Sequence, residues 1–264
     1  MTIARLAAAI LLAMGLAGCA TQQSGDSGPK SGEASTTVNE SPERSRARIH
    51  TQLAAGYYEI GNMGIALEEV KEAQKSDPAF GPAYNLAGLV YSRLKEDGLA
   101  EQSFQRALAI DPSDSDAQNN YGLFLCERGR LEPAVKYFLS AVRNPLYANP
   151  ERAYVNAGVC TRRSGNVAVA EEYFQTALKM RPTQPQALYQ LADLAYGRGD
   201  LATAKGYLGR LAQSGVTTAE VLWLGARVER KLGDRNSEAS YASQLRNRYP
   251  NSAEARALGA GQYE

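Results

Sequence analysis

The residues that could do chemistry in this chain are three cysteines and one histidine. A cysteine nucleophile needs a nearby histidine to take its proton, and an Asn or Asp to orient that histidine. The only histidine, His50, is remote in sequence from Cys126 and Cys160, and two cysteines without clustered histidines make a poor zinc site. We therefore predict no enzyme, no catalytic residue, no metal and no cofactor. His50 is interpreted as a packing residue on a helix.

The third cysteine, Cys19, follows a short apolar segment. Residues 1–5 carry one positive charge, and residues 6–16 form an Ala- and Leu-rich run that is too short to span a bilayer. This pattern predicts a secretory signal peptide over residues 1–18. Its last residues and the cysteine, LAGC, resemble the lipobox of bacterial lipoproteins. The resemblance implies cleavage before Cys19 and acylation of the Cys19 thiol.

The resemblance to lipoproteins also implies a location. Ala20, in place of Asp, favours transfer by the lipoprotein-sorting machinery to the outer membrane, with the protein facing the periplasm. Two or more acyl chains on Cys19 give stable anchoring where one gives only marginal binding. An ordinary signal peptide that happens to end in cysteine is the alternative.

Residues 19–45 are predicted to form a lipidated, disordered tether. They are rich in Ser, Gly and Thr with almost no apolar side chain, so burial cannot offset the entropy of ordering them. A chain of this length and composition reaches roughly 25–30 Å. The whole chain has 29 basic and 28 acidic residues, and this balance gives no basic footprint for a nucleic-acid partner.

A repeat of 34 residues governs the rest of the sequence. Asp77-Pro78 and Asp111-Pro112 lie one period apart, and Arg181-Pro182 lies two periods and two residues further on. This period is typical of tetratricopeptide repeats. We predict an all-α, right-handed superhelical solenoid of about six such repeats over residues 46–264, ending in a short capping helix near residues 251–261. The expected repeats are 47–80, 81–114, 115–148, 151–184, 185–218 and, loosely, 219–252.

The matched positions have physical reasons. Gly or Ala at position 8, such as Gly88, and Ala at position 20, such as Ala100, let the two helices of a repeat cross closely. Glycine at position 15, such as Gly129, suits a left-handed residue that ends the first helix. In the sixth repeat Gly225 and Gly233 match only if one residue is inserted.

An insertion separates the third and fourth repeats. The stretch from Arg143 to Cys160 has two extra residues and contains Pro145 and Pro150. Prolines next to asparagines favour defined turns. We predict a rigid turn here.

Tetratricopeptide solenoids bind partners, and positions 2, 5, 9, 12 and 13 of the first helices face the groove. At positions 5 and 9 the first four repeats offer apolar side chains flanked by amides, without a cationic ladder for a carboxylate. Such a groove suits an amphipathic helix or extended segment, with Asn side chains pairing to its backbone. The alternative is that these residues only pack the inner wall. Arg152, Arg162 and Arg163 could form a second, polar contact zone or a solvated face. The predicted groove residues are Thr51, Ala55, Tyr58, Asn85, Leu89, Asn119, Leu123, Val155 and Val159.

Three stretches go beyond the generic repeat pattern: NNYGLFLCERGR, NPLYANPERAYVNAGVC and QPQALYQLADLAYGRGD. Together with the lipobox and the tether they resemble the PilF/PilW family of type IV pilus biogenesis lipoproteins. The resemblance covers the whole chain, and its departures lie in the sixth repeat and the C-terminus. The resemblance implies a pilotin: a monomeric outer-membrane lipoprotein that binds secretin subunits and promotes their localisation and multimerisation. A general envelope scaffold, such as an adaptor for cell-wall enzymes, is the alternative.

Cys126 and Cys160 fall at positions 12 and 10 of adjacent repeats. The periplasm permits disulfides, but a bridge needs Cα atoms within about 7 Å, and neighbouring helix axes lie roughly 8–10 Å apart. We therefore predict that Cys126 is a small apolar residue filling the wall between two repeats. A disulfide is the alternative.

Overall fold

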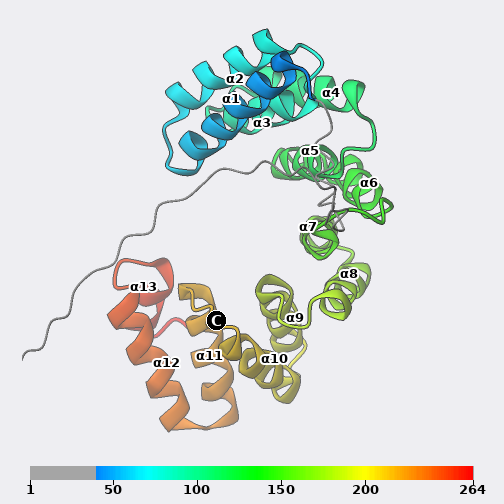
Figure 1. The fold of residues 1–264 in the computed structure, drawn as a ribbon. Coiled ribbons are helices and arrows are strands. Elements are labelled where there is room, and N and C mark those ends of the chain that lie inside the picture. Colours follow the sequence, from blue (N-terminus) through cyan, green and yellow to red (C-terminus); the bar gives the residue numbers. More distant parts are fainter. Residues whose placement is uncertain (1–39, 264) are drawn as a thin grey trace, which may run out of the picture. The chain divides into compact units, whose positions relative to one another are not determined.

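The computed structural model describes residues 40–263. The signal peptide, Cys19 and most of the predicted tether lie outside the described residues. The described part contains thirteen helices and no strand (Figure 1). Their bounds are α1 Pro42–Glu59, α2 Met63–Ser76, α3 Gly81–Arg93, α4 Asp97–Ile110, α5 Ser115–Glu127, α6 Leu131–Ala141, α7 Pro150–Arg163, α8 Val167–Met180, α9 Pro185–Gly197, α10 Leu201–Gln213, α11 Ala219–Leu232, α12 Arg235–Arg248 and α13 Ala253–Gly259.

The helices form six consecutive pairs, α1/α2 to α11/α12, and each pair packs against the next. The first helices also contact one another in the order α1, α3, α5, α7, α9, α11, and α13 extends this row by packing on α11. Each pair is one tetratricopeptide repeat, so the predicted superhelical solenoid of six repeats is confirmed. The row of first helices is the wall on which the predicted groove residues stand.

The first repeat begins earlier than predicted. Helix α1 begins at Pro42, inside the range 19–45 expected to be tether, and the Ser41 side chain caps it by accepting from the Arg44 amide. Ser at the N-cap, Pro at the first position and an acid in the first turn are a strong start signal. Arg44 Nε lies 2.5 Å from Asp77 Oδ2 at the end of α2. This ion pair helps hold the added turn against the repeat.

Within a repeat, the two helices meet at a matched pair of residues. A Cβ added to Gly158 would lie 2.5 Å from the ring of Phe174, and the same close approach joins Gly88 to Phe104. In repeat five a buried Ala192 stands at the glycine position and a buried Leu208 at the aromatic position. The predicted role of position 8 is confirmed, and the size of its residue is matched to the opposite helix.

The predicted capping helix is present. Helix α13 begins after Ser252, whose side chain accepts from the Ala255 amide. Leu258 of α13 is buried with residues of repeat six. After α13 the chain returns to α11, where the carbonyl of Tyr263 accepts from Arg227 Nε at 2.9 Å. The end of the apolar stack is thus covered by its own chain.

The predicted turn between repeats three and four is also present. The Tyr147 amide donates to the Asn144 carbonyl at 3.1 Å, and the Asn144 side chain accepts from the Leu146 amide at 3.0 Å. Leu146 is 88% exposed at the tip of this turn.

Cys126 and Cys160 form a disulfide between α5 and α7, with their Cα atoms 5.8 Å apart. Our prediction of an unpaired cysteine filling the wall was wrong. It compared a Cα–Cα limit with the distance between helix axes. Because Cα atoms lie about 2.3 Å from the axis, residues on facing sides of two helices come several ångströms closer than the axes do.

Candidate functional site

The predicted groove residues divide by accessibility. Thr51, Ala55, Tyr58, Asn85, Leu89 and Val159 are partly buried, and Leu123 is 38% exposed. Val155 and Asn119 are only 1% and 3% exposed. The expectation that these two line an open groove is corrected here: Val155 packs in a core cluster with Phe174 and Leu188, because α9 covers this side of α7.

The asparagines of the inner wall bond to each other. Asn120 donates from Nδ2 to Asn85 Oδ1 at 3.1 Å, and Asn156 donates to Asn119 Oδ1 at 3.0 Å. Each bond joins adjacent first helices at equivalent positions. The side-chain oxygens that were expected to pair with a ligand backbone already accept hydrogen bonds from the neighbouring repeat. These amides therefore set the spacing of the wall.

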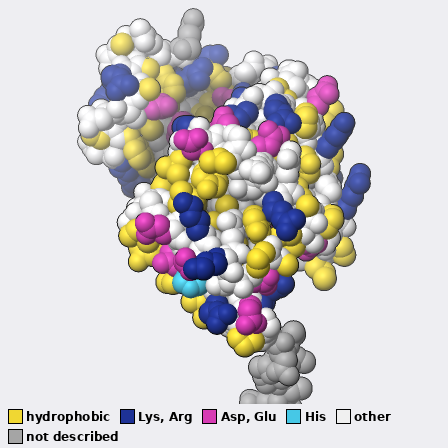
Figure 2. All heavy atoms as spheres, turned by 90° about the horizontal axis from the view of Figure 1, so that it is seen from above, with side chains coloured by type: hydrophobic (Ala, Val, Ile, Leu, Met, Phe, Trp, Pro, Cys, Tyr) yellow, Lys and Arg dark blue, Asp and Glu magenta, His cyan; other side chains and the backbone are white. Residues whose placement is uncertain are grey.

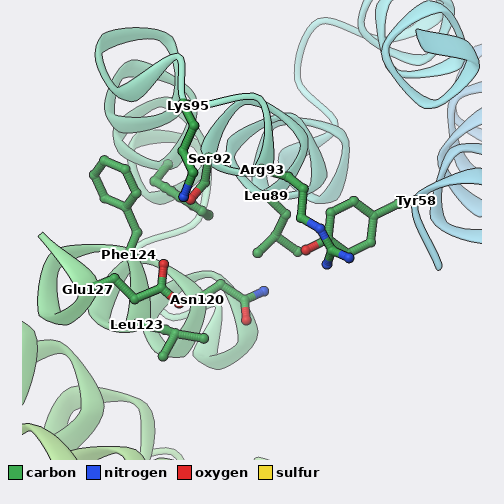
Figure 3. A pocket seen from close by; sticks show the side chains of 10 residues that line it. Tyr58, Leu89, Ser92, Arg93, Lys95, Asn120, Leu123, Phe124 and Glu127 are labelled. Carbon is green, nitrogen blue, oxygen red and sulfur yellow. The ribbon is translucent and has the colours of Figure 1, made fainter. Parts of the chain in front are cut away.

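One accessible part of the wall is a hollow of about 360 Å³ between α1, α3 and α5 (Figure 3). It brings together three of the predicted groove residues, Tyr58, Leu89 and Leu123. The other lining residues are Ser92, Arg93, Lys95, Phe104, Asn120, Phe124 and Glu127.

The hollow combines an apolar floor with two cations. Leu89, Leu123 and Phe124 supply apolar surface, and the Arg93 guanidinium lies 5.4 Å from the centre of the Tyr58 ring. Figure 3 shows Arg93 and Lys95 reaching the hollow from α3 and from the residues that follow it. Neither cation forms an ion pair with any residue in the range 40–263. Both therefore have their charge available for a ligand.

The acidic residue of the hollow is held at its edge. Glu127 Oε2 lies 3.1 Å from Arg128, whose guanidinium also pairs with Asp97 at 2.6 Å and stacks 5.0 Å from the Phe124 ring. The hydrogen bond from Arg128 lowers the pKa of Asp97 below its ordinary value. Arg128 thus offsets the negative charge of Glu127 and keeps Phe124 in place.

Lys95 has an unusual backbone. In the described chain it is the one residue other than glycine with a positive φ, 65°. The corresponding position in the other repeats is glycine, with Gly61, Gly129 and Gly165 at φ values of 82°, 78° and 87°. A side chain in this conformation costs about 1–2 kcal/mol. The strain places a cation at the rim of the hollow, where a glycine would leave none.

Sequence reasoning missed several lining residues for an identifiable reason. Ser92, Arg93 and Glu127 fall at positions 12 and 13, which face the groove, yet only positions 5 and 9 were used to judge its charge. Lys95 follows the helix at position 15, where the pattern signals a turn. Arg93 at position 13 and Lys95 at position 15 are therefore the sequence signal for the two cations of the hollow.

The predicted polar zone in repeat four is used inside the protein. Arg162 donates to Gln190 Oε1 at 2.7 Å and to Asp193 Oδ2 at 2.5 Å, and Arg163 donates to the Cys126 carbonyl at 2.7 Å. These bonds tie α7 to α9 and to α5. Of the three arginines, Arg152 alone is left without such a contact among the residues described.

The single histidine, His50, makes a polar contact between two helices. His50 Nδ1 lies 2.6 Å from Glu69 Oε2, so His50 links α1 to α2 by a polar contact, and the predicted packing role is thereby made more specific. Among residues 40–263 no three His, Cys, Asp or Glu side chains gather as metal ligands. No helix in this range has the length and apolarity needed to cross a membrane. The face in Figure 2 mixes basic, acidic and apolar side chains.

Comparison with known proteins finds tetratricopeptide-repeat models matching residues 81–114, 103–136 and 161–215. The chain is 34% identical over 251 residues to the type IV pilus assembly protein PilF of Pseudomonas aeruginosa, covering 95% of this chain and 96% of that protein. A solved structure from the functional characterization of Pseudomonas aeruginosa PilF aligns with a TM-score of 0.75 and 32% identity, covering 84% of this chain and all of that one. The crystal structure of PilW, a widely conserved type IV pilus biogenesis factor, aligns with a TM-score of 0.71 and 32% identity, covering 80% and 97%.

Proposed function

The chain belongs to the PilF/PilW family of tetratricopeptide proteins of type IV pilus biogenesis, and from this premise we propose that it is a secretin pilotin. In this role it binds secretin subunits of the pilus, brings them to the outer membrane and promotes their multimerisation. Pilus assembly and twitching motility then depend on it.

The observation that carries the proposal is the hollow on α1, α3 and α5. Its floor of Leu89, Leu123 and Phe124 lies beside the cations Arg93 and Lys95. A protein segment with apolar side chains and a neighbouring carboxylate matches both parts. Burial of the apolar side chains supplies most of the affinity, and the cations set orientation and association rate.

The lipid anchor is the second half of the proposal. Acyl chains on Cys19 hand the protein to the lipoprotein-sorting machinery, and the bound secretin travels with it as cargo. The protein then faces the periplasm from the outer membrane. The hollow is built from the first three repeats, which follow the anchor most closely in sequence.

A pair of acidic substitutions in the hollow tests the binding site. Leu89→Glu with Leu123→Glu places two carboxylates on the apolar floor, and we expect capture of purified secretin to fall at least about tenfold, since each buried apolar side chain contributes about 1.5–3 kcal/mol. Capture is measured by surface plasmon resonance, with circular dichroism to confirm helicity. The matched control is Leu99→Glu with Leu146→Glu, which changes two exposed leucines outside the hollow.

A second variant covers the case in which the first does not fold. Arg93→Glu with Lys95→Glu changes two exposed side chains and leaves the apolar floor intact. Weaker capture that is less sensitive to salt supports the site, because the lost attraction is electrostatic. Undiminished capture by both folded variants places the secretin contact elsewhere.

The anchor is tested by Cys19→Ala in a chain that is still cleaved and exported. Secretin multimers in outer-membrane fractions should fall sharply, while binding of secretin by the soluble variant stays normal. Normal multimers in that fraction contradict transport of the secretin with the lipoprotein. Loss of surface pili with normal cell shape on deletion of the gene separates a pilotin from a cell-wall scaffold.

A further inference from the structure

A second hollow lies at the junction of repeats five and six. It has a volume of about 360 Å³ and is bounded by the first turns of α9 and α11 and the end of α10. Its accessible apolar surface comes from Pro185, Val216 and Val221, with the ring of Tyr189, above the buried Leu211. It is built from other helices than the hollow on α1, α3 and α5, and the proposed function does not use it.

The connection from α10 to α11, which borders this hollow, differs from the connections between other repeats. Repeats one, two and four end in an Asp-Pro or Arg-Pro turn, whereas residues 214–218 have no proline. Gly215 instead turns the chain with a φ of 73°, and Val216 follows it at the surface with 38% exposure. Val216 and Val221 also line an adjoining hollow of about 290 Å³ between α10, α11 and α12. The two hollows therefore share Val216 and Val221 at the junction.

The charged group that lines this hollow is acidic. Glu220 is the only charged residue among those that line it, and it forms no ion pair with any residue in the range 40–263. Thr218 is occupied, since its hydroxyl accepts from the Val221 amide. Asp193, which lies near, already forms an ion pair with Arg162 at 2.5 Å. The unbalanced charge at the hollow is therefore that of Glu220.

Tyr189 adds a hydrogen-bond donor. Its hydroxyl takes part in no hydrogen bond within the described chain, and its ring lines the hollow. Burial, followed by the charges of Asp193 and Glu220, raises the pKa of Tyr189 to about 12. The hydroxyl therefore keeps its proton at neutral pH and can donate to a carbonyl oxygen of a ligand.

We propose that this hollow is a second docking site, for a protein segment that carries an apolar side chain next to a lysine or arginine. The apolar side chain contacts Pro185, Val216 and Val221, and the basic group pairs with Glu220. The hollow on α1, α3 and α5 has the opposite preference, because its free charges are Arg93 and Lys95. The solenoid can therefore hold two chemically different segments at separate repeats.

Two synthetic peptides test the proposal. One is an acetylated and amidated hexapeptide of alternating Lys and Leu, and the other has Glu in place of every Lys. Each carries a fluorophore, and binding is followed by fluorescence anisotropy on the chain from residue 40 onward and on the full chain. The variants are Glu220→Lys and Val216→Asp, which change exposed side chains at the hollow. Leu123→Ser, in the hollow on α1, α3 and α5, is the control.

We expect the Lys/Leu peptide to bind the wild-type chain. The Glu220→Lys substitution should lower the affinity for this peptide about tenfold or more, because an ion pair is lost and a repulsion is gained. Glu220→Lys should also improve binding of the Glu/Leu peptide, which a loss of folding cannot do. Val216→Asp should lower the affinity for the Lys/Leu peptide by a smaller factor, because the substitution removes an apolar contact but adds a negative charge. Leu123→Ser should bind it like the wild type.

Two results overturn the proposal. One is no binding of the Lys/Leu peptide to the wild-type chain. The other is equal binding by the wild type and Glu220→Lys. Neither result bears on secretin capture at the other hollow, so the two proposals fail independently.

Discussion

Lys95 combines a strained backbone conformation with a charged side chain at the proposed binding site. The turn between α3 and α4 needs a left-handed residue, and the other repeats supply glycine there, yet this repeat carries a lysine at φ 65°. Such strain persists only where the surrounding structure holds it, and it gathers at functional sites. Because this position holds lysine and not glycine, a cation lies at the rim of the hollow on α1, α3 and α5.

Lys95→Gly should therefore stabilise the protein and weaken the proposed capture of secretin. We expect the free energy of unfolding to rise by about 1 kcal/mol, because glycine adopts this conformation without a steric penalty. Chemical denaturation followed by circular dichroism measures the change. Lys95→Ala is the control, since it removes the charge and keeps the strain. Equal stability of the glycine and alanine variants would contradict the account.

The repeat period predicted the position of some groove residues but not their exposure. Tyr58, Leu89 and Leu123 could be placed in the groove because the 34-residue period fixes their position on the inner wall. Val155 and Asn119 share that register and are buried nonetheless. Whether a wall residue is open depends on the side chains of the next first helix, and these contacts are not contained in the period. The disulfide was missed for a related reason, because helix spacing does not give the distance between facing residues.

At the scale of helices, each repeat is held by a fitted pair of residues. Gly158 admits the ring of Phe174, and repeat five replaces the pair by Ala192 and Leu208. The total side-chain volume at the crossing is thus conserved while its division between the helices changes. The period predicted a small residue at this position, but its partner on the second helix emerged only from the packing.

This fit can be tested by moving one repeat's solution into another. Gly158→Ala should destabilise the protein by about 1–3 kcal/mol, since the new methyl group meets the Phe174 ring. Adding Phe174→Leu should recover part of that loss. A double-mutant cycle measured by urea denaturation should give a favourable coupling of about 0.5–3 kcal/mol. Simple addition of the two single losses would show that the residues do not pack against each other.

Helix starts were less predictable than helix pairs. Ser41, Pro42 and Glu43 form a clear start signal, but they lie in a stretch whose composition resembles the polar tether before it. Composition averages over many residues, whereas a cap depends on one side chain and one amide. The beginning of α1 was therefore placed too late, while the six repeats were predicted correctly.

Across the whole solenoid, ion pairs join neighbouring repeats. Glu101 of α4 lies 2.6 Å from Arg130, Glu171 of α8 pairs with Arg198, and Lys205 of α10 lies 2.8 Å from Glu229. In the first two pairs the acid lies on a second helix and the base lies after the next first helix. The third reverses the charges. These contacts tie repeat two to three, repeat four to five and repeat five to six, in addition to the apolar interface.

Stability should fall in acid because of the pair between Glu101 and Arg130. Hydrogen bonds from Arg130 and then Tyr121 lower the pKa of Glu101 below its ordinary value. A lowered pKa in the folded state gives stability that is present above the ordinary pKa and is lost as pH falls through the lowered one. The urea midpoint should therefore decrease as the pH falls below the ordinary pKa of a glutamate. Glu101→Gln should make this decrease smaller, whereas Glu132→Gln, on the exposed face of α6, should leave it unchanged.

The link between Cys126 and Cys160 has a mechanical consequence. If a load were applied to the two ends of the solenoid, repeats could peel away from either terminus one after another. The covalent bond closes a loop with a sequence separation of 34 residues, one full period, and this loop cannot lengthen under tension while the bond lasts. Repeats lost from one side would thus leave α5 and α7 covalently connected in the middle of the solenoid.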